Sequence, residues 1–238
     1  MSRQRTRVAA LDTLRGFTVI SMVAFHTVYD LAYIYGVSLP WFTHGPVQEL
    51  WRISISWVFL LLAGWMCSLS RNNVRRGLLY AACAATVWAA TTIAAVDTPV
   101  SFGILFCMAG STLAFAMLER CAPTAVERRG IPLAVAFGLL FICTYTVPHE
   151  RYAIGGLAWL GFPDPSFASG DYYPLIPFGF LYLSGACAGC AWRQAKRVYP
   201  GWMRRDWAPP LSWIGRHSLV IYLLHQPAVL GVLSIVLR

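Results

Sequence analysis

Charged residues are scarce in this 238-residue chain, and their scarcity excludes most soluble classes of protein. Only 12% of the residues are charged, whereas a soluble domain carries about 25%. The formal net charge is +9, but a nucleic-acid-binding protein needs its basic residues on a solvated surface, and too little polar sequence is present to form one. Disorder is excluded as well, because 58% hydrophobic and 14% aromatic residues would drive collapse. A mean hydropathy of +0.57 instead indicates an integral membrane protein.

The sequence also lacks the cysteine pattern of a disulfide scaffold or a metal site. Its seven cysteines are an odd number and have no clustered spacing. Cys187 and Cys190 form a CxxC pair, but the pair lies in an apolar helical segment and no second pair accompanies it. We interpret the cysteines as small apolar residues of helices, and we expect no metal.

Long apolar segments are what the sequence does contain, and each is long enough to cross a bilayer as a helix. We predict an all-α bundle of seven transmembrane helices, in a single domain over residues 1–238, at 11–35, 47–70, 77–96, 101–118, 131–147, 174–192 and 213–237. Asp97, Thr98 and Pro99 suit a tight turn between the third and fourth helices. The longest connection, 148–173, is rich in Gly, Pro and aromatic residues.

Basic residues fall in alternate connections of this bundle and predict its orientation. Fourteen of the 19 lie on one side: Arg3, Arg5 and Arg7; Arg71, Arg75 and Arg76; Arg120, Arg128 and Arg129; Arg193, Lys196, Arg197, Arg204 and Arg205. The positive-inside rule makes that side cytoplasmic, so we expect the N-terminus inside and the C-terminus outside. We expect the first helix to stay uncleaved, since Asp12 and Arg15 interrupt its apolar run and no small-x-small site follows.

One face of the first predicted helix carries most of the ionisable groups within the spans. Asp12, Arg15, His26 and Asp30 share that face with Met22. Arg15 and His26, for example, are eleven residues apart, which is a rotation of about 1100° and returns to within about 20° of the start. Pairing of Asp12 with Arg15 and of His26 with Asp30 would explain each pair locally. It would not explain why two polar pairs align across a bilayer, where ionisable groups are costly, so we favour a functional role.

The last predicted helix has a polar face of its own. Ser218, Tyr222, His225 and Gln226 follow one another at helical spacing, and His225 lies near mid-membrane. Hydrogen bonding between helices and a functional role explain this face equally well. Arg216 and His217 lie at the cytoplasmic start of the same helix.

Two ionisable residues on the outer side complete the candidates. Arg52 could pair with Glu49, Asp30 or Asp171, or could hold an anionic ligand. Asp171 suits an N-cap of the sixth helix, ahead of Pro174. Separately, the Gly185-x-x-x-Gly189 spacing permits close helix packing, which we expect inside the bundle rather than in a homodimer, although a homodimer is left open.

Five segments together resemble a known family. The first is LDTLRGFTVISMVAFH, in which Arg15 and His26 are separated by ten residues; the others are FLLLAGWMCSLSR (59–71), FGILF (102–106), DYYPLIPFGFLYLSGA (171–186) and SWIGRHSLVIYLLHQPAVL (212–230). In order and spacing they resemble the transmembrane acyltransferase superfamily, which includes the acyltransferase-3 proteins. The resemblance is to small bacterial members of its heparan-α-glucosaminide N-acetyltransferase catalytic-domain family.

The resemblance implies an enzyme of the inner (cytoplasmic) membrane. It would transfer an acyl group, usually acetyl from cytoplasmic acetyl-CoA, to a hydroxyl or amino group of a carbohydrate or envelope component on the outer side. His26 would be the general base or carry the acetyl group, and Asp30 would orient it. The remaining assignments are Arg15, Arg216 and His217 for binding the CoA phosphates, and Arg52, Asp171 and His225 for the acceptor side.

Two other classes of protein remain open. A small transporter or flippase could line a path with the same polar face, but it should show an inverted repeat or paired broken helices, and we find neither in the sequence. A non-catalytic membrane scaffold could use the same fold, since fold does not imply function. A scaffold, however, has no need of the Arg15–His26 spacing.

Overall fold

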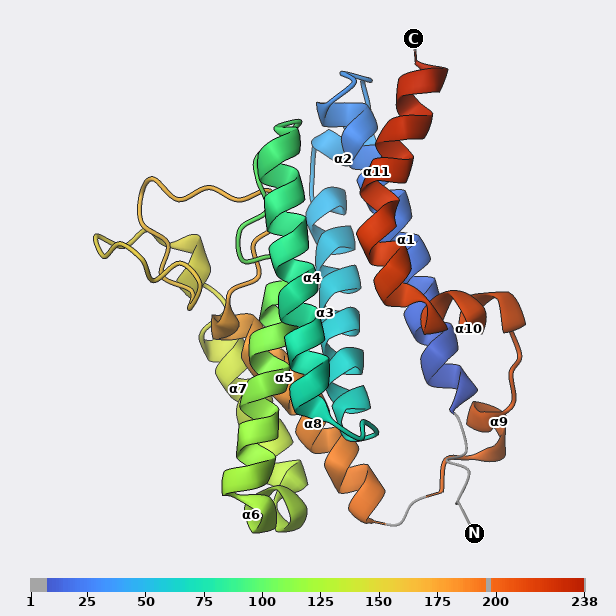
Figure 1. Ribbon diagram of the computed structural model, residues 1–238, viewed down its shortest axis with the longest axis vertical. Helices are drawn as coiled ribbons and strands as arrows, with labels where there is room; N and C mark the ends of the chain where they lie inside the picture. The colour runs from blue at the N-terminus through green and yellow to red at the C-terminus, as the bar shows by residue number, and fades with distance from the viewer. Residues whose placement is uncertain (1–7, 196–197, 238) are drawn as a thin grey trace. The chain divides into compact units, whose positions relative to one another are not determined.

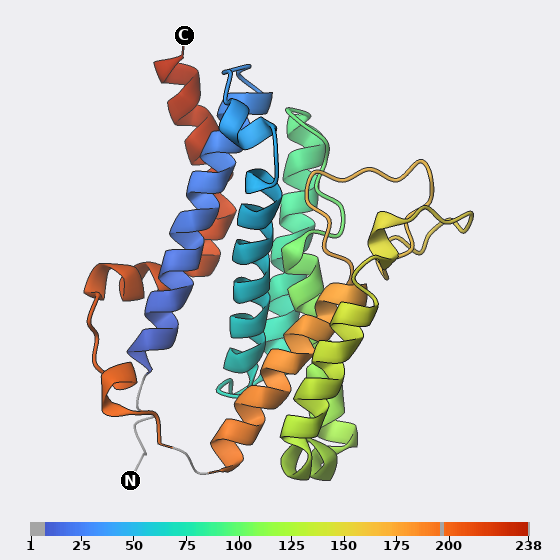
Figure 2. The same ribbon diagram turned by 180° about the vertical axis from the view of Figure 1, so that it is seen from behind.

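A computed structural model describes residues 8–195 and 198–237 of the chain (Figures 1 and 2). These residues form two compact units, of which the first comprises 8–59 and 198–237 and the second comprises 60–195. Five of the basic residues used for the orientation lie outside the described residues: Arg3, Arg5, Arg7, Lys196 and Arg197.

The described part of the chain is helical and contains no β-strand. Its α-helices are α1 (Ala9–Tyr33), α2 (Pro40–Thr43), α3 (Val47–Cys67), α4 (Asn73–Ala94), α5 (Ile104–Cys121), α6 (Pro123–Arg128), α7 (Gly130–Cys143), α8 (Leu175–Gln194), α9 (Gly201–Arg204), α10 (Pro209–Arg216) and α11 (Ser218–Val236), and a 3₁₀ turn η1 covers Val147–His149. The predicted all-α class is therefore confirmed for these residues.

Six of the described segments are long and apolar enough to cross a membrane: Val47–Cys67, Asn73–Ala94, Ile104–Cys121, Gly130–His149, Leu175–Gln194 and Ser218–Val236. These correspond to the second to seventh predicted spans. With 25 residues, α1 is longer than any of them, but it carries Asp12, Arg15 and Asp30 and does not belong to that set. The count of seven spans and the orientation of the termini stay predictions.

In the first unit, α1 packs against both α10 and α11 (Figures 1 and 2). The helices α1 and α11 run side by side in the same direction. Where α10 crosses α1, two glycines allow the backbones to touch. A Cβ atom on Gly16 would collide with the carbonyl oxygen of Leu211, and one on Gly215 would collide with that of Asp12.

The last predicted helix, 213–237, is wrong as a single element. The structure divides it into α10 and α11 at His217, whose backbone has φ −102° and ψ 15°. The amide of His217 bonds back to the carbonyl oxygens of Trp213 and Ile214 and so closes α10. A one-residue break leaves the apolar periodicity almost unchanged, so only the packing of Gly215 on α1 reveals the change of direction.

The second unit packs α4 on α5, and α5 and α7 on α8. Its closest helix crossing lies between α8 and the part of α3 that belongs to this unit. There a Cβ atom on Gly185 would collide with the carbonyl oxygen of Leu61, and one on Gly64 would collide with that of Tyr182. Gly189 faces the carbonyl oxygen of Trp65. The prediction that Gly185 and Gly189 serve internal packing is thus confirmed.

The connection between α4 and α5 is longer than the tight turn expected at 97–99, because α4 ends at Ala94 and α5 begins at Ile104. Ala95 and Phe102 there take positive φ values of 48° and 59°, which apolar periodicity does not signal.

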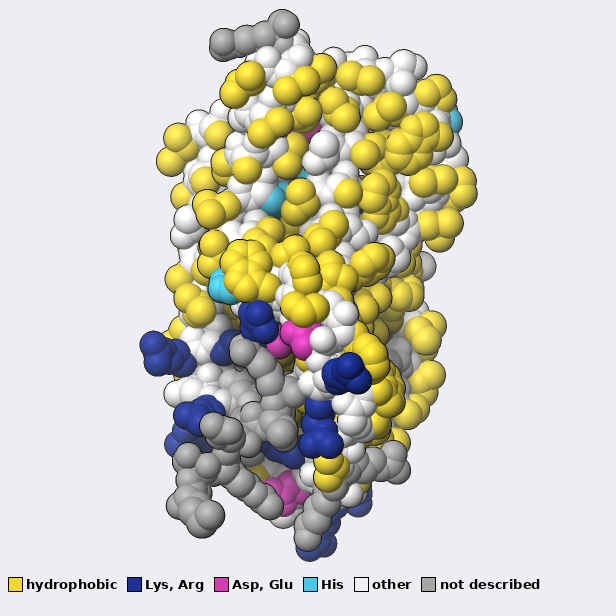
Figure 3. Space-filling model, turned by 90° about the vertical axis from the view of Figure 1, so that its right-hand side faces the viewer, with side chains coloured by type: hydrophobic (Ala, Val, Ile, Leu, Met, Phe, Trp, Pro, Cys, Tyr) yellow, Lys and Arg dark blue, Asp and Glu magenta, His cyan; other side chains and the backbone are white. Residues whose placement is uncertain are grey.

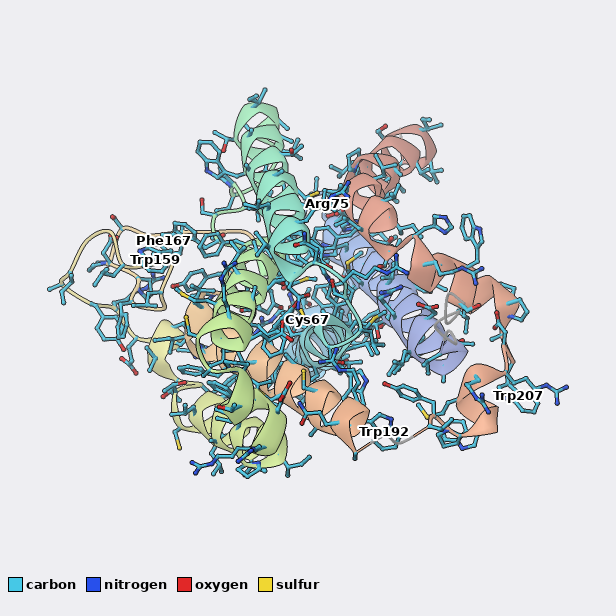
Figure 4. The ribbon with its side chains drawn as sticks, turned by 60° about the horizontal axis from the view of Figure 1, so that its bottom comes forward. Cys67, Arg75, Trp159, Phe167, Trp192 and Trp207 are labelled. Carbon is cyan, nitrogen blue, oxygen red and sulfur yellow. The ribbon has the colours of Figure 1, made fainter. Side chains whose placement is uncertain are left out.

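The long connection over residues 148–173 is held by bonds to its own backbone. Arg151 donates to the carbonyl oxygens of Asp164 (3.3 Å) and Phe167 (2.9 Å). The Tyr172 hydroxyl donates to the carbonyl oxygen of Ala158 at 2.7 Å. Partial burial raises the pKa of Tyr172 to about 12, so this donor keeps its proton at neutral pH. Figure 4 shows Trp159 and Phe167 on this connection.

Candidate functional site

The N-terminal end of the predicted polar face is an ion pair that also joins α1 to α10. Arg15 Nη2 lies 2.8 Å from Asp12 Oδ1, and both side chains are largely buried, with 17% and 7% exposed. Arg15 Nε donates to the carbonyl oxygen of Gly215. Arg15 therefore stabilises the crossing of the two helices, whatever else it binds.

Farther along the same face, two histidines from opposite ends of the chain meet. The rings of His26 on α1 and His225 on α11 have centroids 4.9 Å apart. Nδ1 of His225 lies 2.6 Å from the carbonyl oxygen of Tyr222. A carbonyl oxygen can only accept, so Nδ1 must carry the proton and Nε2 the lone pair. Nε2 is buried and has no hydrogen-bond partner in the described part of the chain.

Asp30 lies next along α1 and is completely buried. The amide nitrogen of Gln226 on α11 donates to its two carboxylate oxygens, at 2.9 and 3.0 Å. The amide oxygen of Gln226 is buried without a hydrogen-bond partner among the described residues. Gln226 belongs to the polar face noticed in the sequence, but helical spacing gives no sign that its partner is Asp30. That Asp30 also orients His26 stays a prediction.

An aromatic cluster behind His26 attaches the start of α3 to α1. The Phe25 ring packs edge-on against the rings of His26 (5.7 Å), Phe42 (5.6 Å) and Trp51 (5.5 Å). Trp51 Nε1 donates to Ser21 Oγ at 2.8 Å. These residues are not among the candidates that the sequence predicts, because aromatic residues are frequent throughout the chain and only packing distinguishes this group.

Arg52 pairs with Glu49, one of the three acidic partners that the sequence suggests for it. Its Nε and Nη2 lie 2.9 and 2.6 Å from the carboxylate oxygens of Glu49, three residues earlier on α3. The pair is partly exposed, with 34% of the Arg52 side chain and 52% of the Glu49 side chain accessible. Exposed pairs of this kind contribute little to stability, about 0–1 kcal/mol.

Arg216 and His217 lie at the bend between α10 and α11 and are exposed. The sequence predicts both residues in the first turn of one straight helix. In the structure Arg216 instead ends α10, and His217 is the N-cap of α11. Arg204 and Arg205 are exposed on α9 and just after it. Figure 3 shows this side of the first unit, with Lys and Arg side chains gathered below and hydrophobic side chains above. Trp207, labelled in Figure 4, is 64% exposed and lies among these basic residues in the sequence.

Asp171 belongs to the second unit, and its predicted role as the N-cap of the sixth helix is wrong. Pro174 is the N-cap of α8, without a side-chain bond. Asp171 Oδ2 instead accepts from the backbone amide of Ile104, the first residue of α5, at 3.2 Å. The first amides of a helix lack partners within it, so a carboxylate from a distant segment can serve them.

We expect Asp171→Ala to destabilise the protein by about 0.5–2 kcal/mol, the usual cost of removing a side-chain acceptor from a helix start. Asp171→Asn retains an acceptor oxygen and should recover most of the loss. The measurement is the free energy of unfolding in detergent. Equal loss in both variants would mean that the negative charge, and not the bond to Ile104, is what matters.

The second unit buries a polar cluster of its own. The hydroxyl of Tyr182, which is fully buried, lies 3.0 Å from Cys67 Sγ and 2.7 Å from Thr112 Oγ1. Figure 4 shows Cys67 in the interior, surrounded by side chains of neighbouring helices. These bonds join α3, α5 and α8 and account for the three groups structurally. No group of three or more His, Cys, Asp or Glu residues that could hold a metal ion lies together in the part of the chain that the structure describes.

The family model of the heparan-alpha-glucosaminide N-acetyltransferase catalytic domain matches residues 7–227. The chain belongs to this family. No curated protein and no solved structure matches it. The match begins before α1 and ends within α11, so it includes every candidate residue named above. As a family member whose described residues include six apolar helices of spanning length, the chain is a multi-pass membrane protein of the acetyltransferase type.

Proposed function

We propose that this acetyltransferase-family protein moves an acetyl group from cytoplasmic acetyl-CoA to a hydroxyl or amino group of a carbohydrate or envelope component outside the inner membrane. The observation that carries the proposal is that His26 lies within the segment that matches the acetyltransferase family. His26 lies on the polar face of a membrane-length helix, next to a second histidine. A neutral imidazole in that position is suited to take a proton from an attacking hydroxyl or amine.

Three residues are proposed to bind the donor. Arg15 lies about 16 Å before His26 along the helix, a length that the extended pantetheine arm of CoA can span. Arg216 and His217 are exposed at the bend between α10 and α11, close in sequence to Gly215, which Arg15 contacts. A guanidinium group binds phosphate oxygens in a bidentate manner, so Arg216 suits the anionic nucleotide part of CoA.

The proposed chemistry is acyl transfer with His26 as the base. As the acceptor oxygen or nitrogen forms its bond to the acetyl carbon, His26 removes the proton from it, and the carbon–sulfur bond of the thioester breaks. The departing sulfur takes the proton and leaves as the free thiol of CoA. In the covalent variant of the same proposal, His26 itself carries the acetyl group between donor and acceptor.

Arg52 and His225, both in the first unit, are proposed to contact the acceptor, and Asp171 in the second unit stays a separate prediction. Arg52 is paired with Glu49 and partly exposed, so it can contact a polar acceptor without losing its partner. Asp171 would act near the start of α5, where its carboxylate already holds a backbone amide. A homodimer stays open, and nothing in the proposed chemistry requires one.

Binding of acetyl-CoA to the purified protein in lipid nanodiscs tests the donor side of this proposal. Wild type should bind acetyl-CoA, and Arg216→Ala should weaken binding by about 5- to 20-fold, the loss expected for one charge-assisted contact. Glu127→Ala is a matched control, because Glu127 is a charged, exposed residue on α6. Absence of binding by wild type in every lipid condition would contradict the proposal and favour a transporter.

A further inference from the structure

His225 has a defined protonation state that the function proposed above does not use. Its Nδ1 lies 2.6 Å from the carbonyl oxygen of Tyr222, one helical turn earlier on α11. Because the oxygen is only an acceptor, the neutral ring must be the Nδ1–H tautomer. The lone pair therefore lies on Nε2, and the bond to the backbone holds the ring in this orientation.

Nε2 of His225 is a buried acceptor without a hydrogen-bond donor among the described residues. Leaving such an atom unpaired costs about 1–3 kcal/mol, so a donor is expected to reach it at some stage of the working cycle. The apolar side chains of α1 and α11 cannot supply one. The donor must be a polar side chain, a water molecule or a substrate.

The ionisable groups that surround His225 in the first unit narrow the choice. From α1 these are His26, with its ring centroid at 4.9 Å, and Asp30; from α11 the nearest is Tyr222, with its ring centroid at 5.6 Å. Both oxygens of the Asp30 side chain accept from the amide nitrogen of Gln226, so these two groups are engaged with each other. His26 has the closer ring and becomes a donor at both nitrogens when it takes up a second proton.

We propose that His225 is the proton acceptor for His26, so that the two imidazoles share the proton released during acyl transfer. The proposal rests on the function proposed above. When His26 takes the proton of the attacking hydroxyl or amine, its imidazolium donates to Nε2 of His225. The proton then returns through His26 to the sulfur as the carbon–sulfur bond breaks. One bond to the acetyl carbon forms, one breaks, and one proton moves from acceptor to CoA.

The hydrogen-bonded pair Gln226–Asp30 fixes the position of α11 relative to α1 beside the two histidines. Gln226 directly follows His225 on α11, and its bifurcated bond to Asp30 joins α11 to α1 one turn beyond His26. Because Asp30 is fully buried, water cannot replace the Gln226 donor, and loss of that donor would be costly. The same bond therefore keeps His225 opposite His26. In this account His225 is a positioning and proton-accepting residue that acts through His26.

Two substitutions of His225 separate proton transfer from hydrogen bonding. His225→Asn keeps a donor for the Tyr222 carbonyl oxygen, and His225→Gln keeps an acceptor near the position of Nε2, but neither can take a proton. Both should lower kcat by about 10- to 1,000-fold and change KM for acetyl-CoA less than twofold. The exposed Ser234→Ala on the same helix is the control that should retain wild-type kcat.

The dependence of kcat on the fraction of deuterated water distinguishes a relay from a merely structural role. Two moving protons give a curved dependence in wild type, and one moving proton gives a straight line in both variants. Wild-type kcat with a curved dependence in His225→Asn would overturn the relay while leaving the transferase function intact. Absence of acetyl transfer by wild type would instead overturn the function on which the relay depends.

A direct measurement of the tautomer needs no variant and no activity. Nitrogen-15 NMR of histidine-labelled protein in lipid should show a protonated Nδ1 and an unprotonated Nε2 for the histidine whose signal disappears in His225→Asn. A resting His225 that carries its proton on Nε2 could not accept one from His26, and this result would overturn the proposal by itself.

Discussion

The His26→Ala variant should lose acetyl transfer by roughly 10²- to 10⁴-fold, the range typical for removal of a general base. Because acetyl-CoA is proposed to bind through Arg15, which lies earlier on α1, and through residues at the bend before α11, its affinity should change little. The substitution removes only the contacts of the His26 ring with Phe25 and His225, so α1 should remain folded. The measurement is the initial rate of acetyl transfer, with the acetyl-CoA dissociation constant and the melting temperature as companions.

A substitution series over the histidines makes this expectation sharper. His149 lies on the 3₁₀ turn η1 of the second unit and bonds to the carbonyl oxygen of Tyr145, so His149→Ala should stay within about twofold of wild type. His44, which is exposed just after α2, completes the first-unit series with His217 and His225. If the largest loss of rate falls on His44 or His217 and not on His26, the assignment of the base is wrong.

Gly215→Val should have the largest effect on stability, because it places side-chain atoms where α10 touches α1. Even a single Cβ atom there would overlap the carbonyl oxygen of Asp12. Overpacking in a core usually costs about 1–3 kcal/mol, and a side chain cannot rotate away from a backbone atom. We therefore expect a loss at or above the top of this range, a large share of the total stability of a typical protein. The measurement is the free energy of unfolding in mixed detergent.

Gly231→Ala is the matched control for that substitution. Gly231 lies within α11, and a Cβ atom there would meet nothing within 4 Å. Since glycine in a helix is less favourable than alanine by about 0.5–1 kcal/mol, this variant should be neutral or slightly more stable. Gly16→Ala, on the other side of the crossing, should behave like Gly215→Val. Unchanged stability in both crossing variants would show that α1 and α10 do not pack in this way.

Most of the membrane-length helices could be predicted from their composition, because a bilayer imposes a minimum apolar length that is visible in any such segment. The shared face of Asp12, Arg15, His26 and Asp30 could be predicted too, since helical geometry alone determines it. The bend at His217 could not, because a single residue outside helical geometry barely disturbs the apolar pattern.

The partners of the site residues needed the folded chain. Asp30 and Gln226 are 196 residues apart, and Arg15 and Gly215 are 200 apart, so no local spacing connects them. Asp171 illustrates the same limit in the second unit. Its position three residues before Pro174 predicts a cap of the helix that follows. Its carboxylate instead accepts a hydrogen bond from the first amide of α5. Local rules identify a helix start that needs an acceptor, but not which acceptor reaches it.

The scarcity of charge by itself determined that this is a membrane protein, because a surface in contact with water requires many more charged groups than the chain has. The sequence also determined which few polar groups needed explanation, since each is costly within a bilayer. Only the tertiary structure decided that His26 lies beside His225 and that Asp30 accepts a hydrogen bond from Gln226. These pairs form because buried polar groups must find partners, and packing of α1 on α10 and α11 determines which ones are within reach.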